Sequence, residues 1–220
     1  MAAALKALRN HLLARPTIAL SAQWPALRWL RAMRRVNSIQ LRAAELRTIA
    51  VTVKRKAPCN FLVFGLGNDA AFWHRLNRGG TTVFLEDNEE WLRKVAGRHP
   101  RITASLVDYG TRRAQWRELL DAPAQKLAMN LPESVERTRW DVILVDAPEG
   151  WDEMTPGRMK SIFLASQLVA ADGDVFVHDC DRQVEQAFCD RFLKPENLFA
   201  EVESLRHYRI AGDLCEIGPT

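Results

Sequence analysis

The sequence predicts an α/β fold with a mostly parallel sheet of seven strands, helices on both faces and an antiparallel hairpin at the C-terminal edge. Short apolar runs alternate with helix-compatible segments after residue 60, which is typical of parallel strands joined by crossover helices. The 220 residues, 47% of them hydrophobic, suffice for one buried core and are too few for two ordinary domains. We therefore expect a basic helical arm over residues 1–36 and one domain over residues 37–220.

The predicted elements follow from the spacing of apolar residues and from the prolines. Helices are predicted over residues 3–14, 24–35 and 39–53, the last of which Pro58 stops. Strands are predicted over residues 61–64, 82–85, 102–107, 142–145, 174–177, 200–205 and 208–217. The last two have no room for a helix between them, so they predict the antiparallel hairpin. Residues 121–139 are the least regular stretch and predict a mobile loop over a site.

Positive charge is concentrated at the N-terminus. Residues 1–56 carry twelve Lys and Arg against Glu45 alone, a net charge of +11, whereas the rest of the chain carries 19 basic and 26 acidic residues, a net charge of −7. Such an arm can contact nucleic acid, an anionic membrane surface or an acidic polymer, or simply form a solvated helical face. Few aromatic residues interleave with these charges, so we expect no nucleic-acid partner. Without a run of eighteen apolar residues, we expect no transmembrane segment.

A glycine pair lies between an apolar strand and a helix in the segment NFLVFGLGNDAAFW. Gly65 and Gly67 lack Cβ atoms, so a ligand can approach the backbone closely at this turn. Glu86 ends the next strand, nineteen positions after Gly67, where its carboxylate can accept hydrogen bonds from ribose hydroxyls, and Asp87 competes for that role. Asp108, after the third strand, either meets an adenine edge or forms a loop turn. The pattern predicts a Rossmann-like nucleotide site.

Two cofactors fit this site, a nicotinamide dinucleotide and S-adenosylmethionine. A dinucleotide places its pyrophosphate at the start of the helix, where Asp69 would repel it. The ammonium group of S-adenosylmethionine can instead pair with that carboxylate. The sheet uses all the predicted strands, so no second domain remains for a hydride acceptor. Together with Asp69, this favours S-adenosylmethionine over a nicotinamide dinucleotide.

Acidic side chains follow the fourth and fifth strands of the core. Asp146 ends WDVILVDAPEGW, and His178, Asp179 and Asp181 end GDVFVHDCDR. The carboxyl ends of strands in an open α/β sheet face the ligand crevice. These groups are candidates for a general base or for a divalent-metal site, with Asp146 and Asp179 as the metal ligands. Asp146 as a turn cap and Asp181 as a helix cap are the alternatives.

Six ordered segments resemble the plant glucuronoxylan 4-O-methyltransferase family, which includes the irregular-xylem proteins. They are PCNFLVFGLGNDAAFW, GGTTVFLEDNEEW, DVILVDAPEGW, PGRMKSIF, DVFVHDCDRQVE and LRHYRI, and the resemblance as a whole spans about residues 38–212. The resemblance implies a class I methyltransferase fold, S-adenosylmethionine as the donor and methylation of O4 on glucuronic acid side chains of xylan or a related glycan. It also implies a Golgi location. Members typically carry a Golgi membrane anchor, whereas this N-terminus carries a basic arm, so a cytoplasmic location stays open.

The resemblance gives the candidate residues specific roles. Gly65, Gly67 and Glu86 match cofactor positions, whereas Asp146, His178, Asp179 and Arg158 match the acceptor side. Asp146, His178 and Asp179 are the candidate bases for a sugar hydroxyl, which is a poor nucleophile at neutral pH. Arg158 or Arg182 can bind the uronate carboxylate through two parallel hydrogen bonds. Arg158 is the preferred candidate, because Pro156 and Gly157 predict a shaped loop that enters a helix there. Trp151 can stack on a sugar ring. Two other functions stay open, methylation of another acceptor such as a small phenol or a nucleic acid, and a non-catalytic role in glycan synthesis.

Overall fold

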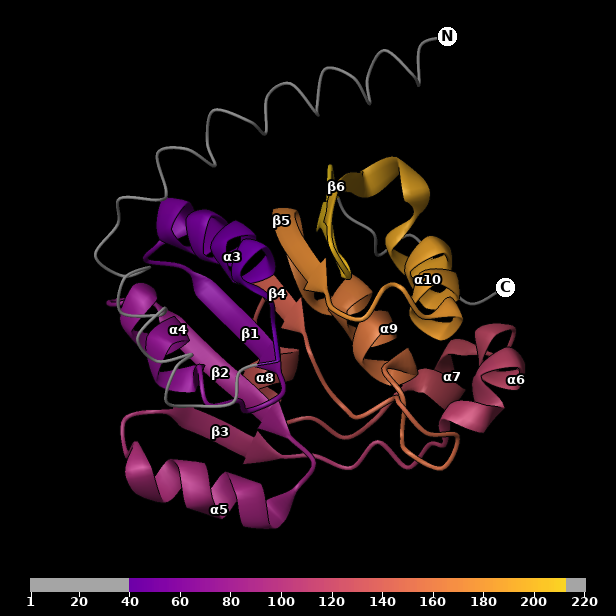
Figure 1. Ribbon diagram of the computed structural model, residues 1–220, viewed down its shortest axis with the longest axis horizontal. Coiled ribbons are helices and arrows are strands. Elements are labelled where there is room, and N and C mark those ends of the chain that lie inside the picture. The colour runs from indigo at the N-terminus through magenta and orange to yellow at the C-terminus, as the bar shows by residue number, and fades with distance from the viewer. Residues whose placement is uncertain (1–39, 213–220) are drawn as a thin grey trace, which may run out of the picture.

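A seven-stranded sheet with the strand order β3-β2-β1-β4-β5-β7-β6 forms the centre of the molecule (Figure 1). The computed structural model describes residues 40–212, so the helices predicted over residues 3–14 and 24–35 and the end of the last predicted strand lie outside the described residues. The strands are β1 (Asn60–Phe64), β2 (Thr81–Glu86), β3 (Thr103–Leu106), β4 (Trp140–Val145), β5 (Val169–Val177), β6 (Leu198–Val202) and β7 (Leu205–Arg209).

The pairing of the strands confirms the predicted sheet. β1 pairs in parallel with both β2 and β4, and the parallel ladder continues to β3 on one side and β5 on the other. β7 runs antiparallel to β5 and to β6, which places the hairpin at one edge of the sheet. The carboxyl ends of β1, β2, β4 and β5 therefore lie along one rim.

The hairpin begins earlier in the sequence than we predicted. Its turn contains Glu203 and Ser204, whereas the predicted strands placed the turn at Arg206 and His207. His207 instead lies buried in β7, where its Nε2 contacts Oδ1 of Asp174 at 2.6 Å and its ring stacks on Phe176. The polar residue His207 is thus accommodated in the sheet because a neighbouring carboxylate compensates the buried imidazole.

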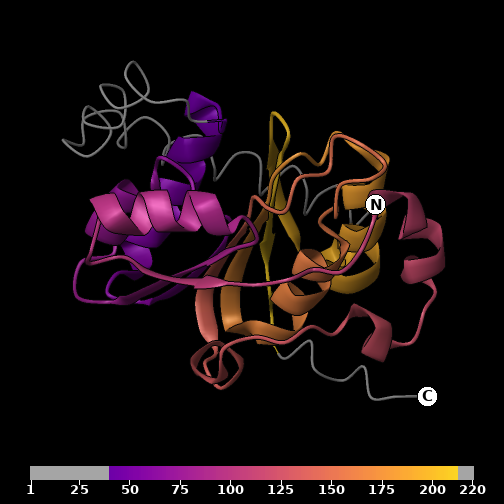
Figure 2. The same cartoon turned by 90° about the horizontal axis from the view of Figure 1, so that it is seen from below.

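Helices cover both faces of the sheet, as Figures 1 and 2 show. One face carries α3 (Ala43–Lys56), α4 (Ala70–Leu76) and α5 (Glu89–Arg98), whose apolar side chains pack against one side of β1, β2 and β4. The other face carries α6 (Trp116–Leu120), α7 (Ala124–Leu127), α8 (Glu133–Glu136), α9 (Met159–Leu168) and α10 (Gln183–Phe188). These helices hold the loops at the carboxyl rim from both sides.

Residues 121–139 do not form the loop over a site that we predicted. They contain α7 and α8, and the side chains of Leu127 and Val135 are fully buried in the same apolar cluster as α9. The indole of Trp140 also donates a hydrogen bond to the carbonyl of Val135 at 3.1 Å. The two prolines in this stretch precede α7 and α8 rather than breaking up the structure.

We expect deletion of residues 1–36 to leave a folded protein. Helix α3 begins only at Ala43, and its buried residues, such as Leu46 and Ile49, belong to the described core. The free energy of unfolding, measured in urea by circular dichroism, should change by less than about 1 kcal/mol. A deletion of residues 1–50 is the control, because it removes part of α3 and should prevent folding. Unfolding of the shorter deletion would place residues 1–36 within the cooperative core.

Candidate active site

The carboxyl ends of β1, β2, β4 and β5 open into a cavity of about 880 Å³. This size suits a small-molecule ligand, for which cavities of roughly 300–1,000 Å³ are usual. Most of the predicted site residues line it, namely Gly65, Gly67, Asp69, Glu86, Asp146, Trp151, Arg158, Asp179 and Arg182. Asp108 and His178 are not among its described lining residues. The sheet therefore brings the predicted cofactor and acceptor groups together at one rim.

The loop after β1 requires glycine at position 65 and leaves little room for a side chain at position 67. Gly65 has a φ of +112°, and a Cβ atom on it would lie 3.0 Å from that of Ala147 in the loop after β4. A Cβ on Gly67 would clash with the carboxylate of Asp69. The bare backbone of this loop thus forms one wall of the cavity and allows a ligand to approach closely.

Glu86 fixes the shape of this loop from the end of β2. Its carboxylate accepts a hydrogen bond from the amide of Leu66 and another from the amide of Asn88, both at 2.9 Å. Burial raises its pKa. Each oxygen retains a second lone pair, so Glu86 can still accept hydrogen bonds from a ligand hydroxyl.

Asp69 lies at the start of α4, with 8% of its surface exposed. One carboxylate oxygen accepts a hydrogen bond from the indole of Trp73 at 2.8 Å. Burial, together with the negative charge of Asp146, raises the pKa of Asp69 to about 6. A cationic ligand group is therefore the natural partner for this carboxylate, because it would relieve the cost of burying the negative charge.

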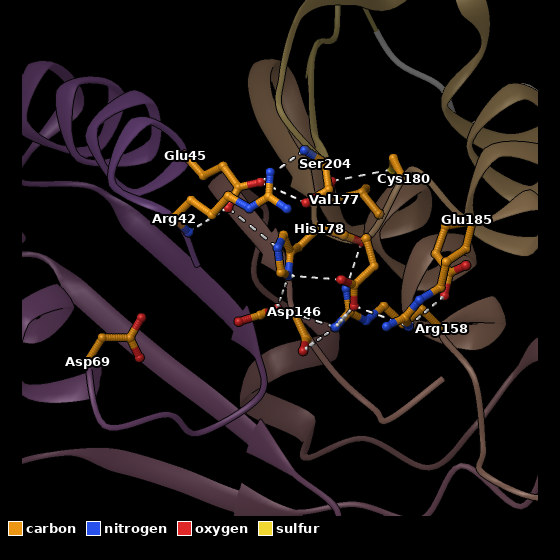
Figure 3. A network of polar contacts seen from close by, with 12 residues as sticks. Arg42, Glu45, Asp69, Asp146, Arg158, Val177, His178, Cys180, Glu185 and Ser204 are labelled. Atoms are coloured by element: carbon orange, nitrogen blue, oxygen red, sulfur yellow. Dashed lines mark hydrogen bonds and ion pairs between the residues drawn. The ribbon is translucent and has the colours of Figure 1, made fainter. Parts of the chain in front are cut away.

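Asp146 and His178 form a pair in which the carboxylate faces the cavity and the imidazole lies behind it (Figure 3). Oδ1 of Asp146 lies 2.8 Å from Nδ1 of His178. Although burial lowers the pKa of His178, the hydrogen bond and charge of Asp146 and the charge of Asp179 raise it above its usual value. Asp146 can therefore contact a ligand in the cavity directly. His178 lies where it can orient the carboxylate of Asp146 and neutralise its charge.

Glu45 completes this network and is a residue that sequence reasoning missed. It is fully buried on α3, and one oxygen lies 3.5 Å from Nε2 of His178. The other accepts hydrogen bonds from the amide and the hydroxyl of Ser204 at 3.0 and 2.8 Å. His178 therefore lies between two carboxylates (Figure 3). The signal that could have found Glu45 is its isolation as the sole acidic residue among the twelve basic residues of positions 1–56.

Arg158 clamps the strand ends from the N-terminus of α9. It is 2% exposed, and one terminal nitrogen donates to the carbonyl of His178 at 2.6 Å. The other lies 2.8 Å from the carbonyl oxygen of Asp146, 3.3 Å from its carboxylate and 2.8 Å from the carboxylate of Asp179. Both terminal nitrogens of the guanidinium are thus engaged within the protein.

Arg182 is more available than Arg158. Its side chain is 31% exposed, lines the cavity and lies 3.2 Å from the carboxylate of Asp179. Behind it, the carboxylate of Glu185 is buried 3.9 Å away and has no hydrogen-bond partner among the described residues. Trp151 also lines the cavity and is 69% exposed, so its ring can contact a ligand.

The predicted metal site does not fit the geometry. Among residues 40–212, no group of three or more His, Cys, Asp or Glu side chains is arranged to hold a metal ion. The two predicted ligands, Asp146 and Asp179, both contact the guanidinium of Arg158. This positively charged group lies between the two carboxylates, where a metal ion would have to bind.

Asp108 is not brought to the cavity. Its carboxylate accepts a hydrogen bond from the amide of Gly110 at 2.9 Å, and Gly110 has a φ of +57°. This is the loop turn that the sequence left open as the alternative to an adenine contact. The structure thus divides the predicted cofactor residues into four that line the cavity and one that shapes a loop beside β3.

Several proteins with related sequences are named as polysaccharide O-methyltransferases. Over 184 residues the chain is 38% identical to glucuronoxylan 4-O-methyltransferase 2 of Arabidopsis thaliana, covering 74% of this chain and 63% of that protein. It is 39% identical to arabinogalactan O-methyltransferase 2 of the same plant, covering 72% of this chain and 62% of that one. The chain thus spans a little under two thirds of the length of these relatives.

Among solved structures, a SAM-dependent O-methyltransferase from Thermotoga maritima shares the fold. The match has a TM-score of 0.53 at 12% identity and covers 86% of this chain and 72% of that one. It confirms the Rossmann-like fold of class I methyltransferases that we predicted. The family model for IRX15/IRX15L/GXM matches residues 44–130 and 122–208, which is most of the described chain. By this match and by its relatives, the chain belongs to the IRX15/IRX15L/GXM family.

Proposed function

We propose that the protein is an S-adenosylmethionine-dependent O-methyltransferase that methylates O4 of glucuronic acid side chains on xylan or a related glycan. The observation that carries this proposal is the position of Asp146, which lies in the same cavity as the glycine loop and Glu86. A donor bound by the loop and an acceptor hydroxyl beside Asp146 would meet there. The names of the relatives support a glycan acceptor.

The described residues fit the donor. The backbone at Gly65 and Gly67 leaves room for it, Glu86 can accept hydrogen bonds from its ribose hydroxyls, and Asp69 can pair with its ammonium group. When bound, the donor would supply a methyl group on a positively charged sulfur, and that sulfur would keep the electron pair of the carbon–sulfur bond when the methyl group passes to the acceptor oxygen.

The protein contributes alignment and proton transfer to this reaction. Alignment of the acceptor oxygen with the methyl group lowers much of the barrier of such an in-line displacement. Asp146 would accept the hydroxyl proton, while His178 and Arg158 hold its carboxylate in position. Asp179 contacts both arginines and is placed to orient them rather than to act as the base.

For the uronate carboxylate we propose Arg182 as the binding residue, since the terminal nitrogens of Arg158 are already engaged within the protein. Arg182 can turn its guanidinium from Asp179 toward a ligand carboxylate, and Trp151 can cover a sugar ring.

No helix among the described residues is long and apolar enough to cross a membrane. The Golgi location that the family resemblance implies remains a prediction.

Glu86→Ala should weaken binding of S-adenosylmethionine by about 1–3 kcal/mol, because a charged hydrogen-bond acceptor is lost and the loop at Leu66 loses its anchor. Isothermal calorimetry with S-adenosylmethionine and with its demethylated product measures this directly. Glu90→Ala, at an exposed position of α5, is the control and should bind normally. NAD should not bind the parent protein. An unchanged affinity in Glu86→Ala would remove Glu86 from the cofactor site.

Binding of S-adenosylmethionine should weaken as the pH falls through about 6. Burial and the charge of Asp146 set the pKa of Asp69 at about 6, so its carboxylate is ionised above that pH and neutral below it. The neutral form cannot form an ion pair with the ammonium group. Calorimetry between pH 5 and 8 should show this loss in the parent protein and a weaker pH dependence in Asp69→Asn. The same pH dependence in both proteins would exclude Asp69 as the cause.

The acceptor is tested by comparing turnover with a labelled donor on several substrates. Glucuronoxylan oligosaccharides should be methylated, whereas uronate-free xylan and small phenols should not. If arabinogalactan alone is methylated, the acceptor is arabinogalactan and not xylan, as the name of another relative suggests. Donor binding without transfer to any glycan would favour a non-catalytic role.

A further inference from the structure

A second hollow, of about 560 Å³, lies at the opposite end of the sheet from the active site. The C-terminal ends of α4 and α5 form its sides, and the segments that lead into β2 and β3 form its floor. Both helices begin beside the active-site cavity, where Trp73 and Trp91 line the wall, and end at this hollow. With ten residues, α5 separates the two places by about 15 Å.

The hollow is lined by arginines. Four of them contribute to it together with two histidines, and none of its described lining residues is acidic. These six residues are His74, Arg75, Arg78, Arg98, His99 and Arg101. Residues 57–220 as a whole carry a net charge of −7, so this is a local reversal of sign in an acidic body. Repulsion among the four guanidinium groups costs free energy unless an anion binds between them.

Helix dipoles account for only part of this charge. Cations in the last turn of a helix stabilise its C-terminus, which explains Arg75 on α4 and Arg98 on α5. Arg78 and Arg101 lie beyond the ends of both helices, so the dipoles do not account for them. Moreover, Arg78, Arg98 and Arg101 are exposed and form no ion pair with any other residue of the range 40–212. Their guanidinium groups remain available to a ligand.

We propose that this hollow is a second binding site for the acceptor polymer, in which Arg78, Arg98 and Arg101 bind carboxylates of uronate residues remote from the one that reacts. Guanidinium groups match the geometry of carboxylates and bind them through paired hydrogen bonds. The proposal rests on the proposed function, because that function requires a polymer with repeated carboxylates. A polymer bound at both sites gains affinity by holding its second contact at high effective concentration, whereas a short oligosaccharide reaches the active site alone.

The test is the triple variant Arg78→Gln, Arg98→Gln, Arg101→Gln. Its matched control is Arg93→Gln, Arg117→Gln, Arg191→Gln, which removes the same charge from exposed positions outside the hollow. Affinity electrophoresis with polymeric glucuronoxylan should show binding about tenfold weaker in the test variant than in the control. The KM for a short glucuronoxylan oligosaccharide should be the same in both. The salt dependence of polymer binding should also be shallower in the test variant.

The outcomes for the hollow and for the proposed function are separable because polymer binding is measured without turnover. Equal polymer affinity in the test and control variants would overturn the second site, even if both enzymes methylate the oligosaccharide. Binding of inorganic phosphate to the hollow, without any effect of the variant on glucuronoxylan, would also overturn it. Loss of polymer affinity in the test variant alone would support the site, and absence of transfer to any glycan would then count against the catalytic function only.

Discussion

Asp146→Asn is expected to lower the turnover number by about 10²–10⁴-fold, the range that loss of a general base produces. The substitution keeps the size of the side chain and removes the charge that would accept the proton of the acceptor hydroxyl. Folding should survive because Arg158 retains Asp179 as an ionic partner and His178 retains Glu45. Donor affinity should change little, because the glycine loop and Glu86 are untouched.

Turnover is measured with labelled S-adenosylmethionine and saturating glucuronoxylan oligosaccharide, and calorimetry checks donor binding in the same preparation. Asp121→Asn, at an exposed position after α6, serves as the control and should have full activity. His178→Gln should show a smaller loss than Asp146→Asn, since the imidazole acts through the carboxylate. Full activity of Asp146→Asn would show that another group accepts the proton.

Arg158→Met should destabilise the fold by about 3–5 kcal/mol, the usual cost of removing one partner from a buried ion pair. The substitution leaves the carbonyl of His178 without its donor and the carboxylates of Asp146 and Asp179 without the guanidinium between them. Urea denaturation followed by circular dichroism measures the change. Arg158→Lys keeps the charge but loses the fork, so its loss of stability should be smaller.

Arg182→Met tests whether Arg182 binds the substrate, in contrast to Arg158, which stabilises the fold. The side chain of Arg182 is 31% exposed, but it also lies 3.9 Å from the buried carboxylate of Glu185, so the free energy of unfolding should fall by about 1–3 kcal/mol, less than for Arg158→Met. The KM for the acceptor should rise as well, because the proposed partner of the uronate is lost. A stable Arg158→Met with a raised acceptor KM would reverse the two assignments and return the uronate to Arg158.

The parallel core of the fold could be predicted because its strands are apolar runs separated by helices. The register of the hairpin could not, since Arg206 and His207 are polar residues that interrupt the apolar pattern between the two predicted strands. Only the position of Asp174 on the neighbouring strand shows why a histidine is tolerated inside β7. Contacts of this kind join positions that are far apart in the sequence, and no local pattern reveals them.

Part of the candidate site could also be predicted from the sequence, and part of it could not. Gly65, Gly67 and Glu86 follow successive strands, so the edge at which they meet follows from topology. The burial of Arg158 depends on carbonyl groups of the loops after β4 and β5, which carry no signal in the side-chain sequence. The contact of Glu45 with His178 joins α3 to the loop after β5 over more than half the chain. Which arginine is engaged and which is available could therefore come only from the structure.

The most direct test of the proposed function compares two forms of one polymer. Glucuronoxylan and the same glucuronoxylan with its carboxyl groups reduced to alcohols are incubated with S-adenosylmethionine carrying a ¹³C-labelled methyl group, and the products are examined by NMR. We expect the label on O4 of glucuronic acid in the native polymer and little transfer to the reduced one, because O4 is then present without its anionic neighbour. Equal labelling of both polymers, or no label on O4, would contradict the account.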